Sequence, residues 1–121
     1  MTLVDTSVWI DHLRNKVNFL HDLLLEEKVA IHPLIIGELA CGNLRQRDEI
    51  LMLLEFLPHT MVADHSEVMT FLDHHHLYGK GLGWIDLHLL ASCTLSQTPF
   101  WTRDRRLQKE AQRLGISSRF K

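Results

Sequence analysis

Residues 2–10 read Thr2-Leu3-Val4-Asp5-Thr6-Ser7-Val8-Trp9-Ile10, which is a short apolar run, an acid, two hydroxyls and the start of a helical pattern. A strand as short as Leu3-Val4 gains little stability unless both of its faces are covered, so we expect it inside a sheet. Asp5 then stands at the carboxyl end of that strand, which is the edge where open α/β sheets bind ligands. The alternative is that Asp5 or Thr6 only caps the helix predicted for residues 7–14.

The composition is that of a globular protein. The chain has 121 residues, of which 45% are hydrophobic and 23% charged. This size predicts a single domain over residues 1–121 that can bury a core without disulfide or metal staples. No apolar run approaches the ~18 residues of a membrane span, and the first ten residues lack a basic leader, so we expect a cytoplasmic protein with no membrane contact. Cys41 and Cys93 lie in separate apolar patterns and are expected to be small buried side chains.

Apolar periodicity and turn residues predict that strands and helices alternate along the chain. Strands are predicted at residues 3–4, 29–31, 61–62, 99–101 and 116–117, and helices at residues 7–14, 17–27, 33–41, 45–57, 66–77, 85–95 and 104–114. Strands that alternate with helices pair in parallel and are covered on both faces. The predicted fold class is therefore α/β, with a central five-stranded parallel sheet and helices on both faces.

Three further acids stand where an ordinary surface helix would not place them. Glu38 lies in the middle of a predicted helix and inside its apolar stripe, so no cap explains it. Asp86 heads the buried stripe of a later helix, and Asp104 follows a second predicted strand as Asp5 follows the first. A helix cap remains the alternative for Asp86 and Asp104.

These four acids point to a metal ion. Burying carboxylates without partners costs free energy, because each one tends to bind a proton or to find a cation. Four acids from four separate elements, with no basic residue among them, therefore predict a hard divalent cation such as Mg²⁺ or Mn²⁺. Such ions take oxygen ligands and usually keep waters and substrate phosphates in their remaining positions.

The two parts of the chain carry opposite charge. Residues 101–121 hold seven basic side chains and two acidic ones, a net charge of +5, although the whole chain has a net charge of -2. A basic end on an acidic body is typical of a protein that brings a phosphate group to a carboxylate site. The alternative is a solvated terminal helix with no ligand.

Four segments together resemble a known family. They are Val4-Asp5-Thr6-Ser7-Val8-Trp9-Ile10, Ile36-Gly37-Glu38-Leu39-Ala40-Cys41-Gly42, Gly83-Trp84-Ile85-Asp86 continuing to Ala91, and Trp101-Thr102-Arg103-Asp104. In this order, at these separations and in a chain of this size, they resemble PIN-domain ribonucleases, specifically the VapC-type toxins of bacterial toxin-antitoxin pairs. The resemblance spans nearly the whole chain, and it implies a parallel five-stranded sandwich and a metal-dependent endoribonuclease.

The resemblance also implies roles for individual residues. Its acidic cluster corresponds to Asp5, Glu38, Asp86 and Asp104. Asp5 and Asp86 are our candidates for direct metal ligands, with Asp104 and Glu38 holding water or a second ion. Ser7 matches the family's hydroxyl that hydrogen-bonds within the site, and Thr102 matches the hydroxyl that precedes the last acid.

The reaction expected of such an enzyme is hydrolysis of a phosphodiester in RNA. A carboxylate-held cation brings water in line with the leaving oxygen and neutralises charge on the phosphate. Attack by activated water leaves a 5′-phosphate and a 3′-hydroxyl, whereas attack by the RNA's own 2′-hydroxyl leaves a cyclic phosphate. We expect RNA to bind the basic end through Arg103, Arg105, Arg106 and Arg113. Arg106 stands where some relatives carry another acid, which leaves a second metal position open.

The resemblance further implies two protein partners, a VapB-type antitoxin that holds the ribonuclease inactive and a second copy of the chain in a homodimer. Several predicted helices carry more large apolar residues than a thin sheet needs to cover it. We expect some of these residues to line a groove for an amphipathic partner helix, namely Trp9, Leu13, Phe19, Leu24, Leu53 and Phe56. A basic residue of the partner would then enter the acidic cluster in place of the cation.

Other interpretations stay open. The run His74-His75-His76 could bind zinc, but adjacent helical residues point about 100° apart and cannot converge on one ion. A PIN-like domain could also serve only as a binding module. A receiver-type phosphoacceptor shares the α/β fold, Mg²⁺ and aspartates, but it needs adjacent acids after the first strand, where this chain has Asp5-Thr6. The isolated histidines His12, His32 and His88 are interpreted as polar helix or loop residues.

Overall fold

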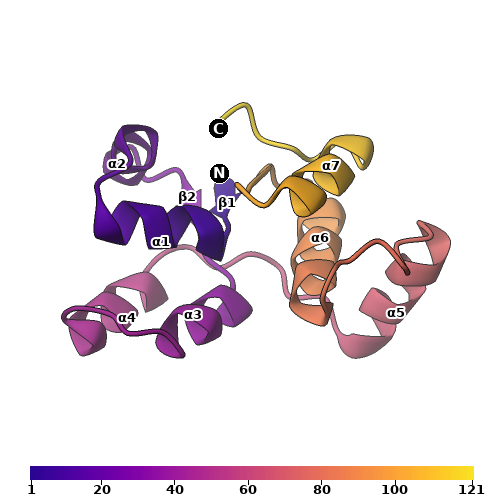
Figure 1. Cartoon of the computed structure of the whole chain (residues 1–121), viewed down its shortest axis with the longest axis horizontal. Coiled ribbons are helices and arrows are strands. Elements are labelled where there is room, and N and C mark those ends of the chain that lie inside the picture. The colour runs from indigo at the N-terminus through magenta and orange to yellow at the C-terminus, as the bar shows by residue number, and fades with distance from the viewer.

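A computed structural model describes residues 1–121 as three strands and seven helices. In chain order the elements are β1 Thr2–Val4, α1 Thr6–Arg14, α2 Asn18–Leu25, β2 Val29–Ala30, α3 Pro33–Ala40, α4 Arg47–Glu55, α5 His65–His74, α6 Trp84–Ser96, β3 Phe100–Trp101 and α7 Arg105–Arg113. Figure 1 shows α1 to α4 on one side of the view and α5 to α7 on the other. All seven predicted helices are confirmed, and none of them has the length and apolar content needed to cross a membrane.

β1 is the middle strand of a parallel sheet with the order β2-β1-β3. Leu3 pairs with Ala30 on one side and with Phe100 on the other, and its side chain is 0% exposed. The pairing continues past the end of β1, because the Asp5 N–H donates to the Trp101 carbonyl at 2.8 Å. Asp5 therefore stands at the carboxyl edge of a fully covered strand, as the sequence predicted.

The prediction of five strands is wrong, because the two outer positions of the sheet hold only single parallel bridges. One joins Ile31 to His59, and the other joins Phe100 to Ser117. Pro58 precedes the first bridge and has no N–H to extend a ladder, so the pairing cannot grow toward the amino terminus. The strand predicted at residues 61–62 does not form, and both of its side chains are about half exposed.

Local sequence signals decide where several helices begin. Pro33 occupies the first position of α3, where a missing N–H costs nothing. The predicted cap Ser66 is wrong, because α5 starts from a reciprocal pair whose cap, Asp64, lies two residues earlier. Asp64 accepts the Glu67 N–H at 2.8 Å and Glu67 accepts the Asp64 N–H at 3.0 Å. This capping box fixes the start of α5 without any tertiary contact.

The apolar core surrounds the sheet and includes one of the two cysteines. Cys93 on α6 is 0% exposed, and burial raises the pKa of its thiol to about 12. The expectation that Cys41 is buried as well is wrong, because Cys41 is exposed. α3 ends at Ala40, so Cys41 lies beyond the apolar stripe in which helical counting had placed it. Neither cysteine forms a disulfide.

Candidate active site

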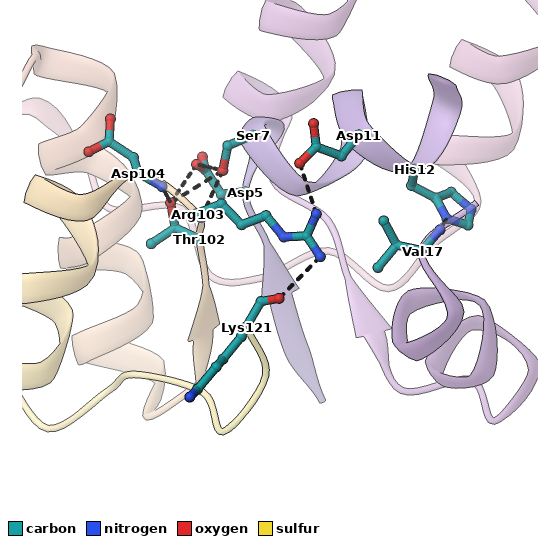
Figure 2. Close-up of polar contacts among 9 residues, drawn as sticks. All are labelled: Asp5, Ser7, Asp11, His12, Val17, Thr102, Arg103, Asp104 and Lys121. Carbon is teal, nitrogen blue, oxygen red and sulfur yellow. Dashed lines mark hydrogen bonds and ion pairs between the residues drawn. The ribbon is translucent and has the colours of Figure 1, made fainter. Parts of the chain in front are cut away.

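Asp5 is a buried carboxylate held by two hydroxyl groups. Only 6% of the residue is exposed, and its Oδ2 atom accepts hydrogen bonds of 2.8 Å from both Ser7 Oγ and Thr102 Oγ1 (Figure 2). Asp5 occupies the N-cap position of α1, but its side chain makes no capping bond. The cap interpretation is therefore wrong for Asp5. Neither hydrogen bond uses Oδ1, which leaves that oxygen free for a ligand.

The two hydroxyls are themselves fixed by the backbone that follows β3. Ser7 Oγ accepts the Arg103 N–H at 3.0 Å, and Thr102 Oγ1 accepts the Asp104 N–H at 3.1 Å. Figure 2 shows these bonds converging between α1 and the end of β3. Each hydroxyl accepts from the backbone and donates to Asp5, so the orientation of the carboxylate is set by two elements far apart in sequence.

Glu38 faces the site from α3 and is half-buried. Its Oε1 accepts a hydrogen bond of 2.8 Å from Thr6 Oγ1. Burial raises the pKa of Glu38, the hydrogen bond from Thr6 lowers it, and the negative charges of Asp5 and Asp86 raise it further. The sequence indicated Thr6 only as a possible helix cap, so this contact was not predicted. The one signal for it was its position beside Asp5.

Asp86 and Asp104 both lie at helix N-termini. Asp86 is the third residue of α6, where its Oδ2 accepts the Gly83 N–H at 3.0 Å. Asp104 is the exposed N-cap of α7, and its Oδ1 accepts the N–H groups of Arg106 and Leu107 at 3.0 and 3.2 Å. The cap interpretation is thus confirmed for Asp104, although its Oδ2 makes no hydrogen bond within the chain.

The four acids share one electrostatic field with no counter-ion from the chain. Burial raises the pKa of Asp86, the Gly83 hydrogen bond lowers it, and the charges of Asp5 and Asp104 raise it. None of the six ion pairs in the chain includes any of these four residues. Carboxylates that repel one another without a cation from the chain offer the oxygen donors that Mg²⁺ or Mn²⁺ accepts.

These side chains do not form a complete metal cage. No three side chains of the His, Cys, Asp and Glu types stand close enough together to hold an ion by themselves. This holds for the four acids and equally for the His74-His75-His76 run. An ion among the four acids would therefore take much of its coordination from water and substrate, as Mg²⁺ commonly does.

Three of the four arginines predicted to bind RNA also make contacts within the chain. Arg103 donates to Asp11 Oδ2 at 2.8 Å and to the Lys121 carbonyl at 3.1 Å (Figure 2). Arg113 lies 2.8 Å from Glu110, and Arg106 reaches the Gly81 carbonyl at 3.5 Å. The fourth, Arg105, is exposed and has no hydrogen bond or ion pair from its side chain to the rest of the chain. Its guanidinium is the one most available to a ligand.

Comparisons with known proteins show the family of the chain. Residues 2–113 match a family model described as PIN domain. This chain belongs to the PIN domain family. It is also 43% identical, over 118 residues, to proteins named Ribonuclease VapC32 from two strains of Mycobacterium tuberculosis, CDC 1551 / Oshkosh and ATCC 25618 / H37Rv, which covers 97% of this chain and 95% of each relative. The resemblance to VapC-type PIN domains is therefore confirmed.

The crowded carboxylates of this PIN domain predict a stability gain when one of them is neutralised. Because the pKa of Glu38 is raised in the folded chain, its ionisation lowers the free energy of unfolding as pH rises above the ordinary Glu pKa of about 4.3. We expect Glu38→Gln to raise the urea midpoint at pH 7 without divalent metal, and to lose that advantage below pH ~4. The matched control is Glu49→Gln at the exposed start of α4, which should show no such gain. Equal effects of the two substitutions on the urea midpoint would contradict a destabilising charge at Glu38.

Proposed function

We propose that this PIN domain is a Mg²⁺- or Mn²⁺-dependent endoribonuclease toxin that cleaves cellular RNA in the cytoplasm and is held inactive by a VapB-type antitoxin. The observation that carries the proposal is the buried Asp5 carboxylate at the sheet edge, surrounded by three further acids and by no cation of the chain. The relatives named Ribonuclease VapC32 support RNA as the substrate.

Asp5, Asp86 and Asp104 would hold the ion. Asp5 Oδ1 and Asp104 Oδ2 make no hydrogen bonds within the chain, so each can be a ligand without breaking an existing contact. A bound divalent ion would neutralise charge on the scissile phosphate and lower the pKa of water. Ser7 and Thr102 hold the Asp5 carboxylate in a fixed orientation, because both hydroxyls donate to its Oδ2 atom.

Glu38 is suited to take a proton from the attacking water. Its raised pKa brings the carboxylate closer to the operating pH, where a general base works best. Thr6 holds Oε1, which leaves Oε2 to accept the proton. Attack by water in this arrangement would leave a 5′-phosphate and a 3′-hydroxyl.

Replacing Asp5 with the isosteric Asn tests the catalytic proposal. Asp5→Asn removes one charge at the centre of the cluster, so we expect cleavage to fall by about 100-fold or more, the scale on which a preorganised electrostatic group acts. Asp73→Asn makes the same chemical change at an exposed site on α5 and should leave cleavage intact. Single-turnover cleavage of labelled RNA in Mg²⁺, Mn²⁺ or EDTA measures the effect, with circular dichroism as the check on folding.

Two outcomes of that assay would overturn the proposal in different ways. Undiminished metal-dependent cleavage by folded Asp5→Asn would reject the site. A wild-type chain that binds RNA but cleaves none with either metal would instead identify the catalytically idle binding module.

RNA is proposed to run along the basic end toward Asp104, in contact with Arg103, Arg105, Arg106 and Arg113. All four side chains are exposed. The contacts that three of them make within the chain hold their guanidinium groups at fixed places, which lowers the entropy cost of binding a phosphate. Arg105 has no such contact and can reorient toward the backbone of the RNA.

Neutralising Arg105 tests this path. Each phosphate contact on a single strand contributes about 0.7 to the slope of log affinity against log salt. We therefore expect Arg105→Gln, in the Asp5→Asn background, to weaken RNA binding and to reduce that slope by about 0.7. Lys16→Gln between α1 and α2 is the control and should change neither quantity. Unchanged RNA affinity at low salt would return residues 101–121 to the role of a solvated terminal helix.

The antitoxin is proposed to cover the exposed apolar face of α4. Leu53 and Phe56 are 52% and 80% exposed, and Phe19 on α2 is 61% exposed. A cleft of about 590 Å³ between α1 and the α3–α4 region contains Leu13 and reaches Glu38. A basic side chain of the partner could follow this cleft to the acidic cluster. Of the six apolar residues expected to line a groove for the partner, two contribute less to it, because Trp9 is buried and Leu24 is only partly exposed.

We also propose that the chain forms a homodimer.

Co-expression with the protein that the neighbouring gene encodes tests whether an antitoxin inhibits this ribonuclease. We expect a stable complex that does not cleave RNA and that releases active ribonuclease when dissociated. Phe56→Asp should weaken this complex by at least about 30-fold, as loss of an aromatic anchor does, while the free enzyme stays active. Leu25→Asp, at a residue 71% exposed on α2, is the control. A chain that is harmless when expressed alone, with a complex indifferent to Phe56→Asp, would refute this account.

A further inference from the structure

His32 is a fully buried histidine that the roles proposed so far do not use. It is 0% exposed, although the sequence had indicated a polar loop residue. Its Nδ1 accepts the Leu34 N–H at 3.1 Å, which makes it the N-cap of α3. A neutral imidazole whose Nδ1 accepts must carry its proton on Nε2. Nε2 lies 3.2 Å from Ser92 Oγ on α6, so this bond runs from His32 to Ser92.

This bond connects the two helices that carry Glu38 and Asp86. Glu38 follows His32 by six residues, and Asp86 precedes Ser92 by six residues. Ser92 is also 0% exposed, and its Oγ accepts the Ala63 N–H at 3.2 Å. No other hydrogen bond or ion pair joins α3 or its cap to α6. The His32–Ser92 contact is therefore the only directional link between these two parts of the site.

We propose that His32 and Ser92 are positioning residues, whose hydrogen bond fixes α3 against α6 and so sets the separation of the Glu38 and Asp86 carboxylates around the metal and the attacking water. The proposal rests on the proposed ribonuclease function and extends it to residues that touch neither RNA nor ion. Outer residues that orient ligands in this way typically change metal affinity or activity by about 10- to 100-fold when they are replaced.

Electrostatics gives the physical reason for such a link. The like charges of Glu38 and Asp86 favour separation of their helices, and apolar packing alone does not fix the position of one helix along another. In a core without water, a hydrogen bond between the helices resists both their separation and their sliding along each other, because breaking it leaves buried polar groups unpaired. Burial, with smaller contributions from the charges of His88 and His59, lowers the pKa of His32 to about 4. The link therefore brings no charge into the core at neutral pH.

Substitutions at three positions separate positioning from simple core stability. His32→Asn can keep the cap on α3, because an Asn oxygen replaces Nδ1, but it cannot reach Ser92. His32→Gln places a nitrogen near the position of Nε2 and can restore the link. Ser92→Ala removes the acceptor, with Ser92→Cys as its nearly isosteric substitute if the Ala variant does not fold. Ser96→Ala is the control, since its Oγ bonds to the Ser92 carbonyl at 2.6 Å on the same helix without touching His32.

The distance between the helices is measured first, in metal-free protein, so that it does not depend on activity. Cys41 at the end of α3 is exposed and Cys93 is buried, so Leu95→Cys on α6 supplies the second site for a pair of spin labels. We expect double electron–electron resonance to show a broader distribution of the distance between the two spin labels in His32→Asn and Ser92→Ala than in wild type. His32→Gln and Ser96→Ala should retain the narrow distribution.

Mn²⁺ affinity by calorimetry and cleavage kinetics complete the test. We expect His32→Asn and Ser92→Ala to weaken Mn²⁺ binding and lower kcat by about 10-fold each, with the KM for RNA unchanged. If both variants lose stability as Ser96→Ala does but keep the wild-type distance, Mn²⁺ affinity and kcat, the bond is only part of the core and the inference is overturned. A wild type that neither binds Mn²⁺ nor cleaves RNA would instead refute the proposed function, and the distance measurement would still decide the link.

Discussion

The site depends on how the Asp5 carboxylate is held in a place that is almost closed to water. A buried carboxylate is costly unless donors or a cation compensate it. Here the donors are two hydroxyls, and both are fixed by backbone N–H groups that follow β3. This arrangement exists only because β1 lies between β2 and β3 and brings residues almost a hundred positions apart to the same sheet edge.

The other three acids differ in whether the nearby helix dipole stabilises their negative charge. Asp86 and Asp104 lie at the N-termini of α6 and α7, where unpaired N–H groups and the helix dipole favour a negative charge. Glu38 lies two residues before the end of α3, where the dipole has the opposite sign. Its hydrogen bond to Thr6 offsets only part of that disadvantage, and its pKa is raised. Burial nonetheless raises the pKa of both Glu38 and Asp86, so the position at a helix end does not by itself decide how readily each acid binds a proton.

Stability and the proposed function oppose each other in this cluster. Like charges that repel in the metal-free chain lower the free energy of unfolding, and a divalent cation would reverse that effect. The surrounding core has to hold the helices in place against this repulsion. Continuous apolar packing around β1 supplies most of the resistance. The buried His32–Ser92 hydrogen bond adds a contact with a defined geometry.

The sequence by itself determined the helices, the position of Asp5 at a strand end and the PIN family, because these depend on local periodicity, capping residues and motifs that a single chain displays. It could not determine the number of strands, since a strand needs partners, and Pro58 and the exposed residues 61–62 left only a bridge where a strand was expected. It could not show which acid caps a helix either, because Asp5 and Asp104 occupy the same local position and only Asp104 makes capping bonds. Tertiary structure alone decided that two hydroxyls hold Asp5, that Thr6 holds Glu38 and that His32 is buried against Ser92, because each of these contacts joins segments that only folding brings together.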